Sequence, residues 1–181
     1  IRPGGAAYPP AMSSELARPA TAGRVVQVSV SSPGGVPKLP VPGRVWVGSL
    51  GLEGDGHRAA PHIHGGPDRA VCLYALEAIA RVAADGHEAF PGAFGENLTV
   101  EGLDWASLRE GDTFEVGDDG LLLELSGPTA PCRNNARWFT DGDFSRISIK
   151  HHPADSRWYA RVLLEGAVRA GDEVRPVRRQ G

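Results

Sequence analysis

The chain has 181 residues, of which 41% are hydrophobic and 23% charged, and its formal net charge is −3 at pH 7. This length supports one domain with a substantial core and is too short for two large ones. The charge excludes a global basic field of the kind that binds nucleic acid or an acidic membrane. We find no signal peptide and no apolar run of membrane-spanning length, so we expect a cytoplasmic protein in which Cys72 and Cys132 are free thiols.

The predicted elements begin after a long lead-in. Residues 1–22 have no apolar periodicity and contain much proline, glycine and alanine, so we expect a flexible segment before a single domain that spans 23–181. Alternating apolar residues predict a strand at 23–31. The apolar run 69–74 predicts a buried strand, in which Cys72 packs as a small hydrophobic residue.

One long segment has the period of a helix. Residues 75–86 form an amphipathic pattern that ends at a helix-stopping Asp-Gly pair. Further on, 103–112 predicts a helical turn capped by Asp104. Trp158 and Tyr159 are expected in the core of a later strand. The core face of the main helix is expected to contain Leu76, Ile79, Ala80, Val82 and Ala83.

The C-terminal half predicts several short strands. Residues 112–116 and 121–125 flank the sequence "GDDG" and predict a hairpin. The segments 109–116 and 169–177 both contain Arg-x-Gly-Asp, and we interpret them as similar turns at the rim of a barrel. These short strands favour a mainly β (α+β) fold: a closed barrel with one main helix and short helical turns. Further strands are expected at 146–150, 158–166 and 172–177.

A cysteine and a glycine-rich loop are the strongest candidates for chemistry. Cys132 lies on a loop stiffened by two prolines and precedes Arg133, a cation that favours the thiolate, which ligates metals and attacks electrophiles. The alternative is a buried loop cysteine. In "HGGPDR", the pair Gly65 and Gly66 lets the backbone approach a ligand closely, and Arg69 has a guanidinium that suits phosphate or carboxylate.

Histidines offer a different kind of site. His57, His62 and His64 could hold zinc or iron, although they lack the paired spacing of a structural zinc site and equally suit a partly exposed loop. His151 and His152 precede a proline, so we expect them in a turn or strand end at the rim of a pocket.

Four segments together resemble a known family. In order and at the expected separations, they are similar to the MOSC domain, named for the C-terminal domain of molybdenum cofactor sulfurases, and most similar to its stand-alone bacterial members. The resemblance covers about residues 23–177 and implies a β-barrel-based fold. It also implies that the cysteine of a Pro-Cys loop, here Cys132, is the functional centre. The four segments are 51–77, 91–112, 121–134 and 143–172.

The resemblance implies a molybdenum-cofactor oxidoreductase. In members that hold this cofactor, the thiolate binds molybdenum, and such members reduce N-hydroxylated small molecules. Cys132 would then be the metal ligand, since soft thiolate suits a metal already held by sulfur. Because the sequence has no nucleotide-binding fingerprint, an external electron donor would be needed.

Other residues receive roles within this hypothesis. Those that match family motif positions are His64, Gly65, Gly66, Asp68, Arg69, Glu96 and Asn97. The candidates for the pterin phosphate are Lys38, Arg69, Arg133 and the Gly65 and Gly66 amides. Asp68, Glu96 and Asn97 would accept hydrogen bonds from the pterin, and His64 would deliver the proton that accompanies N–O cleavage.

One departure from the family pattern keeps alternatives open. Many members have Pro-Arg-x-Pro-Cys, whereas this chain has Thr129 in place of the arginine. Cys132 could instead serve molybdenum-independent sulfur chemistry as a persulfide carrier, a sulfurtransferase or a C–S lyase. A plain ligand-binding module is a third possibility. A deep cationic pocket would favour the cofactor, because a small thiol substrate does not need one.

Overall fold

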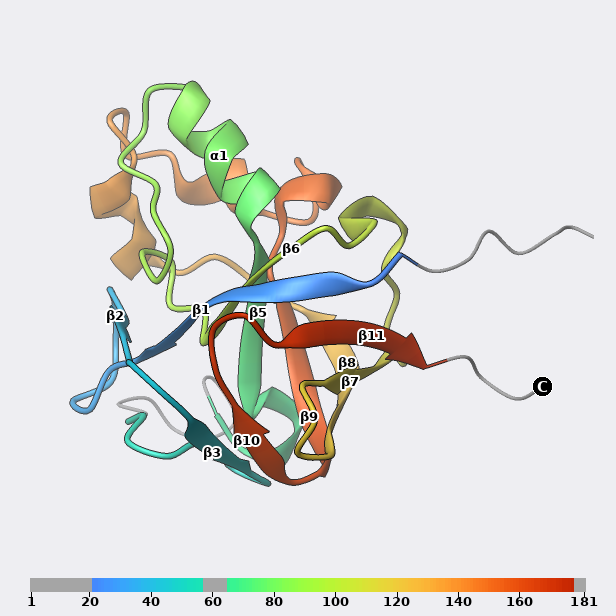
Figure 1. Ribbon diagram of the computed structural model, residues 1–181. Coiled ribbons are helices and arrows are strands. Elements are labelled where there is room, and N and C mark those ends of the chain that lie inside the picture. The colour runs from blue at the N-terminus through green and yellow to red at the C-terminus, as the bar shows by residue number, and fades with distance from the viewer. Residues whose placement is uncertain (1–20, 57–64, 178–181) are drawn as a thin grey trace, which may run out of the picture.

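The computed structural model describes residues 21–56 and 65–177. Within them, one α-helix, α1 (Leu76–Ala84), stands at one end of a barrel of strands (Figure 1). The strands are β1 (Gly23–Val30), β2 (Leu39–Pro40), β3 (Val45–Gly48), β4 (Gly51–Leu52), β5 (Val71–Ala75), β6 (Leu98–Glu101), β7 (Thr113–Val116), β8 (Leu121–Pro128), β9 (Trp158–Leu164), β10 (Gly166–Val168) and β11 (Glu173–Val177). The short 3-10 helices are η1 (Pro67–Arg69), η2 (Trp105–Ser107), η3 (Arg133–Trp138), η4 (Phe144–Ile147) and η5 (Pro153–Asp155).

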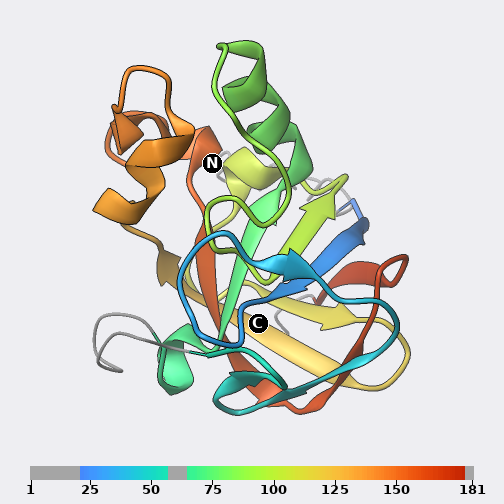
Figure 2. The same ribbon diagram turned by 90° about the vertical axis from the view of Figure 1, so that its left-hand side faces the viewer.

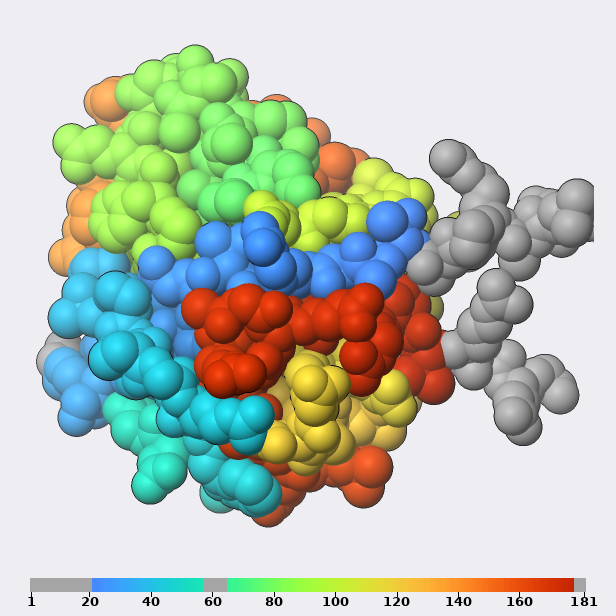
Figure 3. Space-filling model, viewed as in Figure 1, coloured from blue at the N-terminus to red at the C-terminus, as the bar shows by residue number. Residues whose placement is uncertain are grey.

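The barrel closes because the first and last of its strands pair. Around the wall the order is β1, β6, β5, β9, β8, β7 and β11, and β11 returns to β1 with Gly23 opposite Val174. Figure 3 shows this seam as two segments from opposite ends of the chain lying side by side. Only β5 and β6 pair in parallel among these described strands. The prediction of a mainly β closed barrel with one main helix is therefore confirmed. The division into a lead-in and a single domain spanning 23–181 stays a prediction.

Apolar side chains fill the interior of the barrel. In β8, Leu121, Leu123 and Leu125 are buried, while the residues between them are partly exposed. This period of two places one face of the strand inside. The apolar run predicted as a buried strand is β5, in which Cys72 is 5% exposed. A small second sheet, with the order β10-β3-β4, lies at the end of the barrel opposite α1 (Figure 1).

The two Arg-x-Gly-Asp turns are built alike, as the sequence predicted. Gly111 and Gly171 have positive φ angles of 86° and 94°, which glycine adopts without a steric penalty. Asp112 and Asp172 each accept a hydrogen bond from the backbone N–H of the arginine three residues before them, at 2.8 and 2.9 Å. Each turn then leads into a strand, β7 or β11, and these strands are neighbours in the wall.

Two details of the helices correct the sequence analysis. The buried side chains of α1 are Ala78, Ile79 and Val82, whereas Ala80 and Ala83 of the predicted core face are exposed. Alanine suits either side of a helix, so the many alanines left the rotation of the helix undetermined. The turn at η2 does begin after Asp104, but the side chain of Asp104 makes no capping hydrogen bond. Its backbone carbonyl accepts the N–H and the hydroxyl of Ser107 instead.

The strand predicted at 146–150 is wrong, because these residues form the end of η4 and a turn. The Asp143 side chain accepts the backbone N–H of Ser145 at 2.9 Å and so starts a helical turn. Ile147 is the buried apolar residue of this stretch, and Arg146 reaches away toward a buried carboxylate. Long-range contacts therefore override the alternating pattern of the segment.

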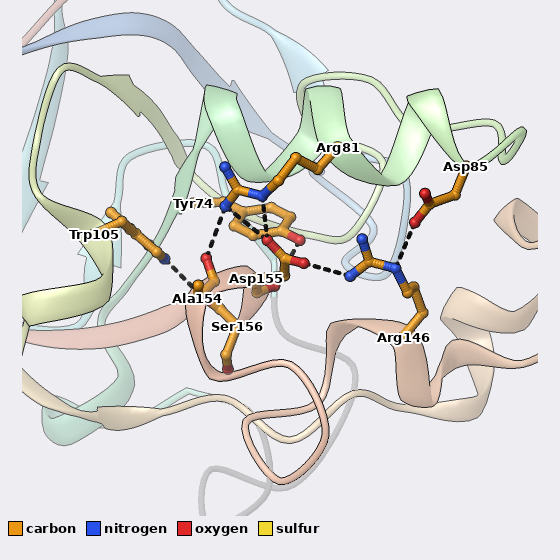
Figure 4. A network of polar contacts seen from close by, with 8 residues as sticks. All are labelled: Tyr74, Arg81, Asp85, Trp105, Arg146, Ala154, Asp155 and Ser156. Carbon is orange, nitrogen blue, oxygen red and sulfur yellow. Dashed lines mark hydrogen bonds and ion pairs between the residues drawn. The ribbon is translucent and has the colours of Figure 1, made fainter.

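That carboxylate, on Asp155, ties α1 to the segment that leads into β9 (Figure 4). Asp155 is 6% exposed, and one of its oxygens accepts Arg81 Nε of α1 at 2.7 Å. Its other oxygen accepts Arg146 Nη1, and Arg146 Nε extends the network to Asp85 at 2.7 Å. Figure 2 shows α1 and the segment around η4 standing side by side at the same end of the barrel.

Backbone contacts fix the chain next to this carboxylate. Tyr74 Oη donates to the Asp155 carbonyl at 2.8 Å, and Trp105 Nε1 donates to the Ser156 carbonyl at 2.8 Å (Figure 4). Both aromatic rings are buried. These two hydrogen bonds therefore fix the backbone of Asp155 and Ser156, directly before Arg157.

Replacing Asp155 by alanine should destabilise the fold strongly. The change leaves the Arg146 guanidinium, whose side chain is only 17% exposed, without its buried partner. Removing one member of a buried ion pair typically costs about 3 kcal/mol, which urea unfolding followed by tryptophan fluorescence would measure. Asp85→Ala is the matched control, since Asp85 binds the same arginine from an exposed position, and it should leave the midpoint nearly unchanged. Equal effects of the two variants would contradict this account.

Candidate functional site

A cavity of about 970 Å³ opens beside the wall of the barrel, within the size range of small-molecule sites. Its lining comes from the loop 30–41, from the start of β5, from 94–97, from 130–137 and from the start of β9. The lining contains no aspartate or glutamate within the described parts of the chain. Its charged members are Lys38, Arg69, Arg133, Arg137 and Arg157. The cavity is therefore cationic in a chain whose net charge is −3.

Cys132 lies in this lining, on the loop that follows β8, and is half-buried. It is the residue directly before η3, and the Asn135 side chain folds back on it to form a capping box. Asn135 Oδ1 accepts the Cys132 backbone N–H at 3.2 Å and lies 3.6 Å from its Sγ. Asn135 is itself fully buried, and its Nδ2 donates to the Phe94 carbonyl at 3.3 Å. These contacts fix the position of the thiol in the cavity wall.

Arg157 is a cavity residue that the sequence analysis did not single out. It is 6% exposed and lies directly before β9, on the same face of the strand as Tyr159, which also lines the cavity. Its Nη1 donates to the Phe94 carbonyl, the same oxygen that Asn135 contacts. Its Nε is buried and has no hydrogen-bond partner. The sequence shows the alternating pattern of β9. It does not show which face of this strand lines the cavity, because that depends on how the barrel closes.

Lys38, a predicted candidate for the pterin phosphate, lines the cavity, but its charge has a counter-ion within the described residues. Its Nζ forms an ion pair with Asp55, whose side chain is 1% exposed. Asp55 also accepts hydrogen bonds from the Ser31 backbone N–H at 2.8 Å and from Asn97 Nδ2 at 2.9 Å. Asn97 further accepts the Cys72 backbone N–H at 3.1 Å. Asn97 therefore joins β5 to this network, and part of its polar capacity is committed there.

Some residues of the glycine-rich loop line the cavity, and others lie outside it. Gly65 and Arg69 line the cavity, and the Arg69 guanidinium lies over the Tyr159 ring, 5.6 Å from its centroid. Tyr159 was expected in the core, so its position here corrects that prediction. Gly66 and Asp68 are not among the lining residues, and the exposed carboxylate of Asp68 forms an ion pair with Arg161 at 3.1 Å.

Glu96 lies behind the cavity rather than in its lining. It is fully buried, and its Oε1 accepts the Gly92 backbone N–H at 2.6 Å while Oε2 has no partner. Burial raises the pKa of this carboxyl, although the hydrogen bond from Gly92 lowers it. Thr129, which replaces the arginine of the family pattern, is also fully buried, and its backbone N–H donates to the Arg157 carbonyl at 2.9 Å. The position of the missing loop arginine and Arg157 thus face each other directly beyond the paired ends of β8 and β9.

The structure describes only two of the predicted histidines. His57, His62 and His64 lie outside the described residues, so a zinc or iron site built from them stays a prediction. His151 and His152 are in an exposed turn and are not among the lining residues. Within residues 21–56 and 65–177, no three His, Cys, Asp or Glu side chains gather closely enough to hold a metal ion. None of the helices in these ranges is long and apolar enough to span a membrane.

Both cysteines are free, and their surroundings differ. Burial raises the pKa of Cys72 to about 11, so its thiol stays protonated at neutral pH. Cys132 is half-buried and stands among cationic side chains. Burial also raises the pKa of Tyr159 to about 12, which keeps this hydroxyl protonated as a hydrogen-bond donor.

Comparison with known proteins shows the family. The model of the MOSC domain matches residues 60–175. Protein YiiM of Escherichia coli (strain K12) is 33% identical over 152 residues, which are 82% of this chain and 66% of YiiM. A crystal structure of YiiM from Escherichia coli superimposes with a TM-score of 0.66 at 28% identity, over 87% of this chain and 70% of that one.

A fungal relative extends the comparison. A Gibberella moniliformis protein with the name "Reductase" is 32% identical over 137 residues, which are 73% of this chain but 23% of that protein. The chain thus spans just under two thirds of YiiM and less than a quarter of the fungal protein.

Only Cys132 should react with iodoacetamide in the native protein. With a pKa of about 11, Cys72 is thiolate in only about one molecule in a thousand at pH 8, and it is 5% exposed. Intact-mass measurement on the full chain, expressed in a host that cannot make molybdenum cofactor, should show a single adduct. Cys72→Ala should keep this adduct and Cys132→Ser should lose it. Alkylation of Cys72 before Cys132 would contradict this account.

Proposed function

Because the chain belongs to the MOSC domain family, we propose that it is an enzyme that binds molybdenum cofactor through Cys132 and reduces N-hydroxylated small molecules. The observation that carries the proposal is the cavity wall, where an accessible thiol stands among five cationic side chains without a carboxylate in the described lining. The fungal relative named as a reductase supports the reaction class.

The residues of the cavity fit this cofactor by their chemistry. A thiolate is a soft ligand and suits molybdenum that already has sulfur ligands. Guanidinium and ammonium groups suit the pterin phosphate, because they form charge-assisted hydrogen bonds with its oxygens. A volume of about 970 Å³ is at the upper end of that of typical cofactor sites. A small thiol substrate would need neither this volume nor this charge.

Each side chain has a defined task in this proposal. The cofactor, when bound, supplies the two-electron redox chemistry that no side chain supplies. Cys132 is the metal ligand, and Asn135 holds the loop that presents it. Arg69 and Arg133 are the chief candidates to bind the phosphate, because both line the cavity and carry guanidinium groups.

The backbone and one histidine complete the assignment. Gly65 lines the cavity with a φ of 103°, a conformation that lets the main chain approach a ligand closely. Asn97 also lines it and is the remaining candidate to accept a pterin N–H. His64 stays our candidate for proton delivery, since histidine titrates near neutral pH. The electron donor is an external molecule, and the substrate is small.

The alternative is sulfur chemistry without molybdenum. Cys132 is half-buried and is the more accessible of the two thiols, so a persulfide carrier, a sulfurtransferase or a C–S lyase could use it as nucleophile. In that case the purified protein should contain an extra sulfur atom on Cys132, which mass spectrometry detects.

Expression in a host that makes abundant molybdenum cofactor tests the proposal. The purified chain should contain molybdenum and pterin in equal amounts, measured by metal analysis and by pterin fluorescence. It should also reduce an amidoxime with a reduced viologen dye as donor. Cys132→Ser should lose the molybdenum and the activity, because it lacks the protein's ligand to the metal. Cys72→Ala is the matched control and should keep both. Wild-type protein without molybdenum from this host would overturn the proposal.

A further inference from the structure

Arg157 differs from three other cations of the cavity. Lys38 has Asp55 as its counter-ion, and Arg133 and Arg137 are exposed to solvent, which stabilises their charge. Arg157 is 6% exposed and forms no ion pair with a carboxylate in the described parts of the chain. The single hydrogen bond of its guanidinium goes from Nη1 to the Phe94 carbonyl, and Nε is buried without a partner.

A buried guanidinium in this state is unfavourable for the folded protein. Taking a charge out of water is expensive unless an opposite charge and hydrogen bonds compensate for it. A guanidinium has five N–H donors, and among the described residues Nη1 has a partner while the buried Nε has none. An anion in the cavity would supply both the missing charge and the missing acceptors.

The nearby carboxyl groups form no ion pair with Arg157 in the described parts of the chain. Glu96 is close enough for Arg157 to lower its pKa, but burial raises this pKa more, and Glu96 does not line the cavity. Asp155 is two residues away in sequence and already binds Arg81 and Arg146. Within the described residues, Arg157 thus lines the cavity while buried and without a carboxylate in ion-pair contact.

Arg157 is connected to the cysteine loop through shared hydrogen-bond partners. The Phe94 carbonyl accepts Arg157 Nη1 and Asn135 Nδ2 together, and the Oδ1 of the same Asn135 side chain lies 3.6 Å from Cys132 Sγ. The backbones are joined as well, since the Arg157 carbonyl accepts the N–H of Thr129 on the cysteine loop. Both residues line the same cavity, so a ligand held there can meet the thiol and the guanidinium.

We propose that Arg157 binds the carboxylate or other oxyanion of the small molecule that meets Cys132, and that the site thereby selects anionic over neutral reactants. The inference deepens the proposed function, because it gives the charge class of the substrate. The binding itself needs only this chain, so it can be measured without cofactor.

Two alkylating agents of similar size provide the test. Iodoacetate and iodoacetamide both react when the thiolate of Cys132 forms an S–C bond and iodide leaves, while the thiol proton goes to solvent. They differ in charge, so the ratio of their rate constants measures anion binding beside the thiol. The probe protein is the full chain with Cys72→Ala, expressed in a host that cannot make the cofactor.

The expected result is a rate for iodoacetate that saturates with concentration and is suppressed by sodium acetate. Arg157→Gln should lower the iodoacetate-to-iodoacetamide ratio by about tenfold or more, the effect of one charge-assisted hydrogen bond. Arg157→Lys, which keeps the charge, should retain most of the ratio. Arg161→Gln, in the strand that follows Arg157, is the matched control, because Arg161 pairs with Asp68 and Glu124 and is not among the lining residues. It should leave the ratio unchanged.

An unchanged ratio in Arg157→Gln, with circular dichroism showing a native fold, would overturn the inference. So would a loss of molybdenum and pterin from cofactor-loaded Arg157→Gln without a change in the alkylation ratio, since Arg157 would then serve the cofactor. If wild-type protein contains no molybdenum but the ratio depends on Arg157, the proposed function fails and the anion site stands.

Discussion

The antiparallel pairing of β8 with β9 is the contact on which the site depends. Its last pairs set Pro128 opposite Trp158, and the Thr129 N–H donates to the Arg157 carbonyl directly beyond them. The cysteine loop leaves the wall where β8 ends, and the chain returns to the wall where β9 begins. The thiol and the buried guanidinium line the same cavity because these two strand ends are fixed to each other.

Side chains outside the barrel wall bind the end of the segment that connects β8 to β9. Arg81 and Arg146 hold the Asp155 carboxylate, and the Tyr74 hydroxyl holds its carbonyl (Figure 4). These contacts fix the start of β9 relative to α1. Rigid elements position functional groups more accurately than free loops do. The carboxylate network is therefore part of what positions the site, although none of its side chains lines the cavity.

Local patterns in the sequence predicted the elements that local physics determines. The alternation of β8 and the two Arg-x-Gly-Asp turns follow from strand pleating and from the φ angles available to glycine. Cys132 could be located from its proline-stiffened loop, and its Cys-x-x-Asn spacing contained a capping signal that identifies Asn135. Arg157 could not be found in this way, because its direction depends on which face of β9 the closed barrel turns toward the cavity.

The errors at 146–150 and in the core face of α1 have related physical causes. Arg146 belongs to a network whose members come from three separate segments, and an alternating pattern contains no information about such partners. The alanines of α1 are compatible with a buried or an exposed position, so the packing of the helix decided its rotation. In both cases tertiary contacts chose among structures that the local sequence allowed about equally.

The net charge of this protein is negative, whereas the charge around its cavity is positive. A formal charge of −3 gives no long-range attraction for anions, yet five cations meet around one cavity. Solvent screens the exposed members of this group over about a Debye length, so they act only on molecules already near the mouth. The buried guanidinium is screened far less, which makes it the stronger discriminator once a ligand is inside. The cavity therefore discriminates between anionic and neutral ligands mainly after they have entered it, and not while they approach the protein.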